Sequence, residues 1–265
     1  MGRLLKTKNA RAGFKANHDN HYKALAHVEA VLKTMGLHYV KKPRNTRVNY
    51  KSFDLVITVG GDGTVLEAAR NLTASQILLG VNSDPSWSVG QFCHATAESF
   101  ERMLGQILRR SAKTIRLQKM KVTLKHGKTK RLFECLNDVL VCHANPAAMS
   151  RYGVSIGREE EEQRSSGMWI ASAAGSTGGI FSAGGRRLPV DDRRLQYHPR
   201  ELYRAKGIKY ALTGGFIRPG KTISLTSHMS NGRIFVDGSH VSYPFIYGQK
   251  IEITASSNYV NLIHG

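Results

Sequence analysis

A glycine-rich turn at residues 60–64 most constrains how this chain can fold. The run Gly-Gly-Asp-Gly-Thr follows an apolar stretch of strand length, residues 53–59, and precedes residues 65–70, whose composition favours a helix. A strand that breaks into glycines and then opens a helix collects backbone N–H groups and the positive end of a helix dipole at one point. The segment therefore predicts a phosphate-binding junction. Asp62 adds a carboxylate that suits a general base or a magnesium ligand in phosphoryl transfer.

The alternative interpretation of this segment is a solvated strand-to-helix turn. Such a turn needs fewer glycines than the three that flank Asp62, so we favour the phosphate site.

Length and composition predict a folded protein of one large or two ordinary domains, since 41% of the 265 residues are hydrophobic. No apolar run approaches the roughly 20 residues that span a bilayer. The first residues lack the apolar core of a signal peptide, and three cysteines form no disulfide framework. We therefore expect a cytoplasmic protein. The Cys-His pairs at residues 93–94 and 142–143 lack zinc-site spacing, so no metal site is expected at them.

The formal charge of +20 predicts partners that carry phosphate groups. Basic residues are scattered in short clusters, and no zinc finger, aromatic RNA-binding motif or continuous basic helix is visible. We expect a phosphorylated small molecule as the partner, with no nucleic acid and no membrane.

Strands and helices alternate in the first part of the chain. Residues 19–36 have a helical pattern with Asp19 as the expected N-cap and Gly36 as the stop. A helix from Thr64, a strand over 77–81 and a helix over 97–110 follow the strand before Gly60. This alternation predicts a parallel sheet whose ligand lies at the carboxyl ends of the strands, where Asp62 falls.

The remainder of the chain has strand composition. We expect strands over residues 115–117, 120–124, 132–141, 152–156, 168–171, 222–226, 233–236 after an Asn231-Gly232 turn, and 249–253, with Glu159–Glu162 as a solvated loop. The predicted fold is an α/β N-terminal domain with a parallel sheet, residues 1–112, plus a β-rich, β-sandwich-like C-terminal domain, residues 113–265. The last strand or tail is expected to be able to return to the first domain.

Two further segments offer polar groups for a nucleotide. Residues 165–185 run from strand composition into small residues, where Ser176 and Thr177 supply hydroxyl groups. Asn137 and Asp138 offer an amide and a carboxylate of the kind that binds ribose hydroxyls. Each segment alone also fits a structural explanation, close helix packing for the first and a turn for the second.

Taken in order, Gly-Gly-Asp-Gly-Thr, the Asn-acid pair and Gly-Ser-Thr followed by Ser-Ala-Gly-Gly resemble the NAD kinases over about residues 54–190. The resemblance implies that Asp62 acts on the acceptor 2′-hydroxyl and that Asn137 and Asp138 hold the nucleotide. It also assigns nucleotide-binding roles to further residues of the same motifs, namely Gly60, Gly61, Gly63, Thr64, Asn82, Ser166, Gly175, Ser176 and Thr177.

Two details resemble the mitochondrial-type branch of that family. Val81-Asn82-Ser83-Asp84-Pro85 replaces the usual Asn-Thr-Gly-His loop, and Ser165-Ser166-Gly167 stands where most members have Gly-Asp-Gly. The chain also departs from the family pattern, with Asp138 in place of Glu and Gly178-Gly179 in place of Ala-Tyr.

The function that these motifs predict is an ATP-dependent NAD kinase that phosphorylates the 2′-hydroxyl of the adenosine ribose. The expected acceptor is NAD or NADH, the expected donor ATP or polyphosphate with Mg²⁺ or another divalent cation, and the expected assembly a homo-oligomer, dimer or tetramer. Two alternatives stay open here. A lipid kinase of the diacylglycerol or sphingosine type shares the Gly-Gly-Asp-Gly-Thr loop, and the altered positions Ser166 and Gly179 would also suit a catalytically weak NAD sensor.

Overall fold

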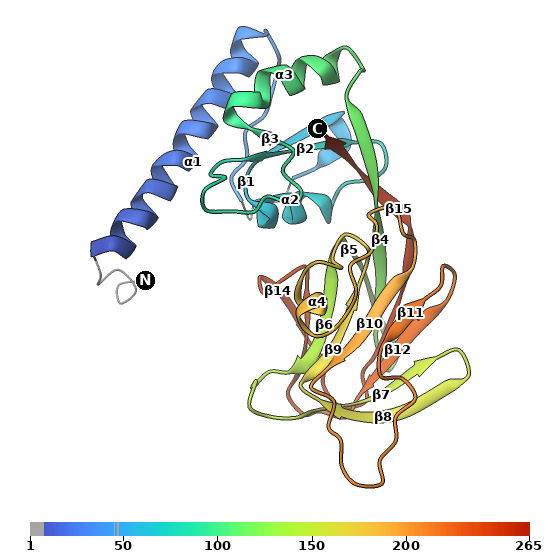
Figure 1. The fold of residues 1–265 in the computed structure, drawn as a ribbon. Coiled ribbons are helices and arrows are strands. Elements are labelled where there is room, and N and C mark those ends of the chain that lie inside the picture. The colour runs from blue at the N-terminus through green and yellow to red at the C-terminus, as the bar shows by residue number, and fades with distance from the viewer. Residues whose placement is uncertain (1–7, 45, 47) are drawn as a thin grey trace. The chain divides into compact units, whose positions relative to one another are not determined.

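The computed structural model describes residues 8–44, 46 and 48–265 and divides into two compact units (Figure 1). The first unit comprises the chain up to Ile115 together with Val260–Gly265, and the second comprises Arg116–Tyr259. The C-terminal segment of the chain thus belongs to the first unit, and the boundary at residue 112 stays a prediction.

The first unit is an α/β layer structure around a parallel sheet. Its elements are α1 (Lys8–Thr34), η1 (Tyr50–Ser52), β1 (Leu55–Gly60), α2 (Asp62–Ala69), β2 (Ile77–Asn82), β3 (Ala95–Thr96) and α3 (Ala97–Leu108). Strands β1, β3 and the end of β15 (Lys250–His264) all pair with β2 in parallel. The strands that pair with β2 are parallel, as the alternation of strands and helices predicts, but the sheet as a whole is mixed because β15 also pairs with β12 (Thr222–Ser227) in the antiparallel direction.

Helices cover both faces of this sheet (Figure 1). On one face, Val28 of α1 and Phe100 and Leu104 of α3 pack with Leu79 and Val81 of β2 in one buried cluster. Successive residues of a strand point to opposite faces, so the alternate residues of β2 point toward α2, which contacts both β1 and β2. Strand β2 is therefore buried on both sides, as its apolar sequence requires, whereas most residues of β1 are half-buried.

The second unit is an antiparallel β-sandwich. Its elements are β4 (Lys113–His126, which begins in the first unit), β5 (Thr129–Cys135), β6 (Asp138–His143), β7 (Ser150–Ile156), β8 (Glu159–Ser165), β9 (Gly167–Ala171), α4 (Gly179–Ser182), β10 (Leu195–Arg200), β11 (Gly215–Ile217), β12 (Thr222–Ser227), β13 (Gly232–Val236) and β14 (Val241–Pro244). One sheet has the order β11-β10-β9-β6-β13-β14, and β15, β12, β7 and β8 with β4 and β5 form the other. A single apolar core joins the inner faces, with Ile170 and Ile234 from one sheet and Val154, Ile223 and Ile251 from the other.

The structure corrects several element boundaries predicted from the sequence. Helix α1 begins at Lys8, so Asp19 lies within the helix and is no N-cap. Helix α2 begins at Asp62 and not at Thr64, which places the Asp62 side chain in the first helical turn. The expected strand over residues 132–141 is two strands, β5 and β6, that belong to different sheets.

The acidic run was predicted as a loop, but it forms the start of β8, which pairs with β7 in the register Val154↔Glu161. Strand β8 lies at the edge of its sheet, where charged side chains are common because they discourage pairing with another chain. The Asn231-Gly232 pair was predicted as a turn, but Gly232 begins β13, and the strands on either side belong to different sheets.

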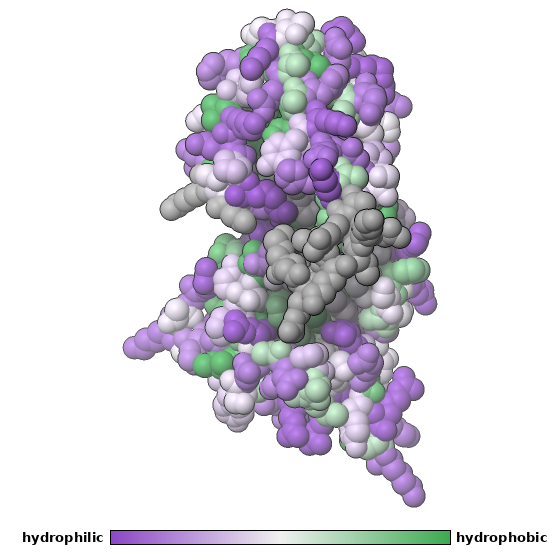
Figure 2. All heavy atoms as spheres, turned by 90° about the vertical axis from the view of Figure 1, so that its left-hand side faces the viewer, coloured by the Kyte–Doolittle hydropathy of each residue, from purple (hydrophilic) through white to green (hydrophobic). Residues whose placement is uncertain are grey.

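The surface fits the strongly polar composition. Hydrophilic residues cover much of the face shown in Figure 2, and apolar residues are scattered among them. Within the part of the chain that the structure describes, no helix combines the length and apolar character needed to cross a bilayer.

Helix α3 has a reciprocal cap whose contribution is testable. The Thr96 hydroxyl accepts the Ser99 N–H, and the Ser99 hydroxyl accepts the Thr96 N–H, at 3.4 and 2.9 Å. We predict that Thr96→Ala lowers the free energy of unfolding by about 1 kcal/mol, because the helix loses an N-cap acceptor. Urea denaturation measures the change. Thr96→Ser retains the hydroxyl and is the matched control, so equal losses in both variants would contradict the capping role.

Candidate functional site

The glycine-rich motif forms the junction between β1 and α2. Strand β1 ends at Gly60, Gly61 is the N-cap, and the Thr64 N–H donates to the Gly61 carbonyl at 2.9 Å. A Cβ atom at Gly60 would stand 2.5 Å from Thr64 Oγ1, so only glycine allows the strand end to lie this close to the helix. Gly60, Gly61, Asp62, Gly63 and Thr64 thus lie together at the helix N-terminus, where backbone dipoles favour an anion.

The Asp62 carboxylate is held by the loop that precedes β3. Its Oδ2 accepts the N–H of Gln91 at 2.9 Å, and its Oδ1 accepts the N–H of Phe92 at 2.8 Å. Each carboxylate oxygen has a further acceptor site, so a ligand hydroxyl can still donate to it. Asp62 is therefore oriented by backbone groups and remains chemically available.

Cys93 and His94 lie beside Asp62 but are kept neutral. Burial, with a smaller contribution from Asp62, raises the pKa of the Cys93 thiol to about 12, so the thiolate form is suppressed. Burial and the neighbouring His264 lower the pKa of His94, and the two imidazole rings stack with centroids 4.5 Å apart. Neither side chain therefore offers an ionised nucleophile or a cation at neutral pH.

Asn82 lies at the end of β2 and shapes the loop that follows. Its Nδ2 donates to the Ser88 carbonyl and its Oδ1 accepts the Asp84 N–H, both at 3.1 Å. Asp84 in turn accepts hydrogen bonds from Asn17 and Asn20 of α1. The hydroxyl of Ser86, followed by these two amides, lowers the pKa of Asp84 and keeps it ionised. The side-chain amide of Asn82 is thus already engaged within the protein.

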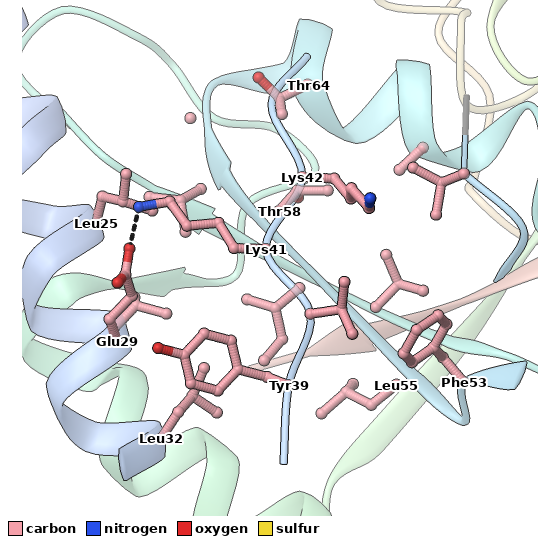
Figure 3. A pocket seen from close by; sticks show the side chains of 18 of the residues that line it. Leu25, Glu29, Leu32, Tyr39, Lys41, Lys42, Phe53, Leu55, Thr58 and Thr64 are labelled. Atoms are coloured by element: carbon pink, nitrogen blue, oxygen red, sulfur yellow. Dashed lines mark hydrogen bonds and ion pairs between the residues drawn. The ribbon is translucent and has the colours of Figure 1, made fainter. Parts of the chain in front are cut away.

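A cavity of about 2090 Å³ in the first unit reaches the glycine-rich junction (Figure 3). Leu25 and Leu32 of α1 and Leu55 of β1 give it apolar walls, and Gly60 and Thr64 line one end.

Basic side chains line the same cavity, and Arg44 reaches the junction at Gly63. Lys41 pairs with Glu29 of α1, and Lys42 also lines the cavity (Figure 3). Arg44 Nε donates to Glu67 Oε2 at 2.9 Å, which fixes the guanidinium beside α2. Positive charge and the helix N-terminus therefore occur together, as a phosphate site requires.

In the second unit, Asn137 and Asp138 lie against the segment of small residues. The Ser172 N–H donates to the Asn137 carbonyl at 2.9 Å, and a Cβ atom at Gly175 would stand 2.1 Å from that carbonyl oxygen. A Cβ atom at Gly178 would stand 3.6 Å from Asp138 Oδ2. The absence of side chains at Gly175 and Gly178 therefore leaves both members of the Asn-acid pair beside the 172–178 segment.

The side chains of this pair have unusual environments. Asn137 Oδ1 is buried and has no hydrogen-bond partner among the described residues. Leaving such an acceptor unpaired costs about 1–3 kcal/mol, so the site favours a ligand or water that donates to it. Burial, followed by the charge of Asp237, raises the pKa of Asp138 to about 7. The pair can thus accept from a hydroxyl, and its charge changes near neutral pH.

Ser176 and Thr177 differ in how much they present to a ligand. The Ser176 side chain is 0% exposed, and its hydroxyl donates to the Ala173 carbonyl at 2.7 Å and accepts the Leu188 N–H at 3.0 Å. Its hydroxyl therefore stabilises the turn, while Thr177 is only half-buried.

Ser166 lies in the bend between β8 and β9. Its N–H donates to the Arg200 carbonyl at 2.9 Å, and the neighbouring Ser165 hydroxyl hydrogen-bonds the buried Tyr152 hydroxyl at 2.7 Å. These contacts fix the bend and leave the Ser166 side chain half-buried.

The predicted site residues therefore form two sets, one in each unit. The structure also reveals residues that hold these side chains in place and that the sequence did not indicate. The backbone N–H groups of Gln91 and Phe92 hold Asp62, and the Asp237 carboxylate holds the backbone of Asn137. Asp237-Gly238 is a turn-forming dipeptide, and this is the local sequence pattern that indicates a turn at Asp237. Nothing local indicates where its carboxylate points.

Comparison with known proteins identifies the same family on independent grounds. The family described as ATP-NAD kinase N-terminal domain matches residues 5–112. The probable NADH kinase of Oryza sativa subsp. japonica is 33% identical over 257 residues, covering 89% of this chain and 78% of that protein. The NADH kinase of Arabidopsis thaliana is 32% identical over 238 residues, covering 81% and 74% of the two chains.

Solved structures of the same family share the fold. The NAD kinase of Archaeoglobus fulgidus, in complex with ATP, superposes with a TM-score of 0.73 at 24% identity over 90% of this chain and 88% of that one. Yeast NADH kinase, complexed with NADH, gives a TM-score of 0.71 at 17% identity, over 80% of this chain and 62% of the yeast chain. The likeness to the mitochondrial-type branch stays a prediction. The match to the plant kinases over most of both chains shows that this chain belongs to the NAD kinase family.

Proposed function

We propose that this protein transfers the terminal phosphoryl group of ATP to the 2′-hydroxyl of the adenosine ribose of NAD or NADH. The observation that carries the proposal is the Asp62 carboxylate, fixed by two backbone N–H groups at the glycine-rich start of α2. Membership of the NAD kinase family supports the reaction class and gives no support to the lipid-kinase alternative.

The first unit would supply the phosphoryl-transfer groups. Asp62 would accept the proton of the attacking hydroxyl or orient that hydroxyl. Gly60, Gly61 and Gly63 would hold donor phosphates through backbone N–H groups at the helix N-terminus, and Thr64 through its hydroxyl, because the Thr64 N–H already donates to Gly61. Arg44 would add positive charge beside Gly63.

The second unit would supply the dinucleotide contacts. The unpartnered Oδ1 of Asn137 would accept from a ribose hydroxyl, and the adjacent Asp138 carboxylate would accept from a second. Gly175, Ser176 and Thr177 would form the pocket wall against the adenine, with Ser176 acting through the turn that it stabilises.

A divalent cation, expected to be Mg²⁺, would enter with ATP and neutralise charge on the phosphates. Mg²⁺ is usually held by substrate phosphates, waters and one or two carboxylates, and Asp62 could serve as such a carboxylate. Among the described residues, no group of three or more His, Cys, Asp or Glu side chains could enclose a metal ion. The cytoplasmic location and the oligomeric assembly stay predictions.

Replacing the Asp62 carboxylate tests the proposed base. We predict that Asp62→Asn lowers kcat by about 10²–10⁴-fold, because an amide cannot accept the proton. The measurement is NADP(H) formation from NAD or NADH with ATP and Mg²⁺. A variant that kept more than about half of the wild-type kcat would rule out Asp62 as the base.

The same substitution also changes the contacts of the loop at residues 91–92. An Asn side chain has one acceptor oxygen, so one of the two backbone N–H groups would lose its partner. Asp62→Glu retains the charge and the acceptors and is the second variant. Urea denaturation of both variants separates loss of the base from loss of the fold, since only the chemical role predicts a kcat loss in a folded Asp62→Asn protein.

Ser166 offers a test of acceptor preference. A carboxylate at this position would attract the positive nicotinamide ring of NAD⁺, whereas neutral Ser166 does not, so we predict weak discrimination between NAD⁺ and NADH. Ser166→Asp should raise the ratio of kcat/KM for NAD⁺ over NADH several-fold, since an exposed charge contact contributes on the order of 1 kcal/mol. A ratio that stayed level or fell would show that Ser166 does not face the nicotinamide.

A further inference from the structure

We propose that Asp237 is a positioning residue for dinucleotide binding, because its carboxylate fixes the connection between β5 and β6 that presents Asn137 and Asp138. The inference rests on the proposed function, since it assigns a role in holding the NAD(H) contacts of the second unit. Asp237 itself need not touch the ligand.

The geometry of the connection between β5 and β6 explains why a carboxylate is needed. Strand β5 ends at Cys135 in one sheet and β6 begins at Asp138 in the other, so Leu136 and Asn137 fall between the two strands. The Leu136 N–H donates to Asp237 Oδ1 at 3.0 Å, and the Asn137 N–H donates to the same oxygen at 2.7 Å. Leu136 is fully buried, and water is therefore no substitute for this acceptor.

A second set of bonds joins the same turn to Asp138. The Asp237 N–H donates to the Asp138 carbonyl at 3.0 Å, and the Gly238 N–H donates to the Asp138 carboxylate. Asp237 has a φ of 49°, a left-handed conformation that Asp, Asn and Gly adopt more readily than other residues. To hold the Asn-acid pair in this way, residue 237 must adopt the left-handed conformation and also carry a side-chain acceptor, a combination that Asp and Asn provide.

Ionisable groups that lie near Asp237 come from three strands. Asp138 on β6 faces it, Lys119 on β4 is 0% exposed, and Glu134 and Cys135 lie on β5. Lys119 Nζ lies 3.8 Å from Glu134 Oε2, and burial lowers the pKa of Lys119 while Glu134 and Asp237 oppose that shift. Asp237 thus interacts electrostatically both with the buried Lys119 and with Asp138, the carboxyl group that would bind ribose.

Two substitutions at Asp237 separate geometry from charge. Asp237→Gly allows the left-handed backbone but removes the acceptor for Leu136 and Asn137. Asp237→Asn can keep an oxygen at the position of Oδ1 while removing the charge. The measurements are kcat and KM for NAD and NADH with ATP and Mg²⁺ from pH 5.5 to 9, and dinucleotide binding by calorimetry.

We expect Asp237→Gly to raise KM and Kd for the dinucleotide by about tenfold or more, with a smaller change in kcat, because ground-state contacts are misplaced. In the wild type, kcat/KM should fall as the pH drops through about 7, where Asp138 becomes protonated. Asp237→Asn should keep KM close to the wild-type value at pH 8 and shift this acidic limb to lower pH, because a neighbouring negative charge is removed.

Ser227→Ala is the matched control for lost stability. The Ser227 hydroxyl is fully buried in the same unit, donates to the Phe245 carbonyl at 2.7 Å and accepts the Met229 N–H at 3.2 Å. Its removal disturbs backbone groups remote from Asn137 and should leave KM unchanged.

The outcomes distinguish this inference from the proposed function. A wild-type protein that neither binds nor phosphorylates NAD and NADH overturns the proposed function. An active wild type together with an Asp237→Gly variant whose KM stays within about twofold, or rises only as much as in Ser227→Ala, overturns the positioning role alone. If Asp237→Gly does not fold, Asp237→Asn decides, because it keeps an acceptor oxygen for Leu136 and Asn137. A KM at pH 8 that rises about tenfold in this variant would show that the charge and not the acceptor is needed, and would overturn the inference.

Discussion

Backbone N–H groups that lie outside helices and strands need acceptors, and both sets of candidate site residues depend on how that need is met. In each unit a carboxylate accepts from two consecutive residues of a loop: Asp62 from Gln91 and Phe92, and Asp237 from Leu136 and Asn137. These bonds join segments far apart in the sequence and replace the ladder bonds that a strand would have provided. Without them the connections at residues 91–92 and 136–137 would lack these acceptors for their N–H groups.

The two carboxylates serve the site in different ways. In the proposed reaction Asp62 is the reactive group, and two backbone N–H groups hold its carboxylate at the start of α2. Asp237 is the support, and the groups that it orients are Asn137 and Asp138. Hydrogen bonds to a charged acceptor are stronger than neutral ones, at about 1.5–3 kcal/mol, so each junction is held firmly by few contacts.

Local patterns in the sequence predicted the parts of the fold that are local in origin. The β1–α2 junction and the parallel sheet follow from glycine spacing and from alternating strands and helices. Edge strand β8 was missed, because four glutamates also suit a loop, and the start of α1 was missed, because Asp19 suits a cap as well as a helix interior. Two features depend on tertiary contacts that no local pattern encodes. They are the inward-facing Ser176 hydroxyl and the hydrogen bond from the Asn137 N–H to Asp237, 100 residues away.

Strand β15 has a consequence for the order of folding during synthesis. Its residues Asn261 and Leu262 pair with Ile77 and Leu78 of β2, so the sheet of the first unit includes a segment made after the whole second unit. Domains generally fold as units while the chain emerges, beginning at the N-terminus. Here a nascent chain that has reached Ile115 still lacks β15, one of the neighbours of β2. The pairing of β2 with β15 forms only after almost the entire second unit has been made. The second unit is therefore positioned to fold first, and the first unit to be completed last.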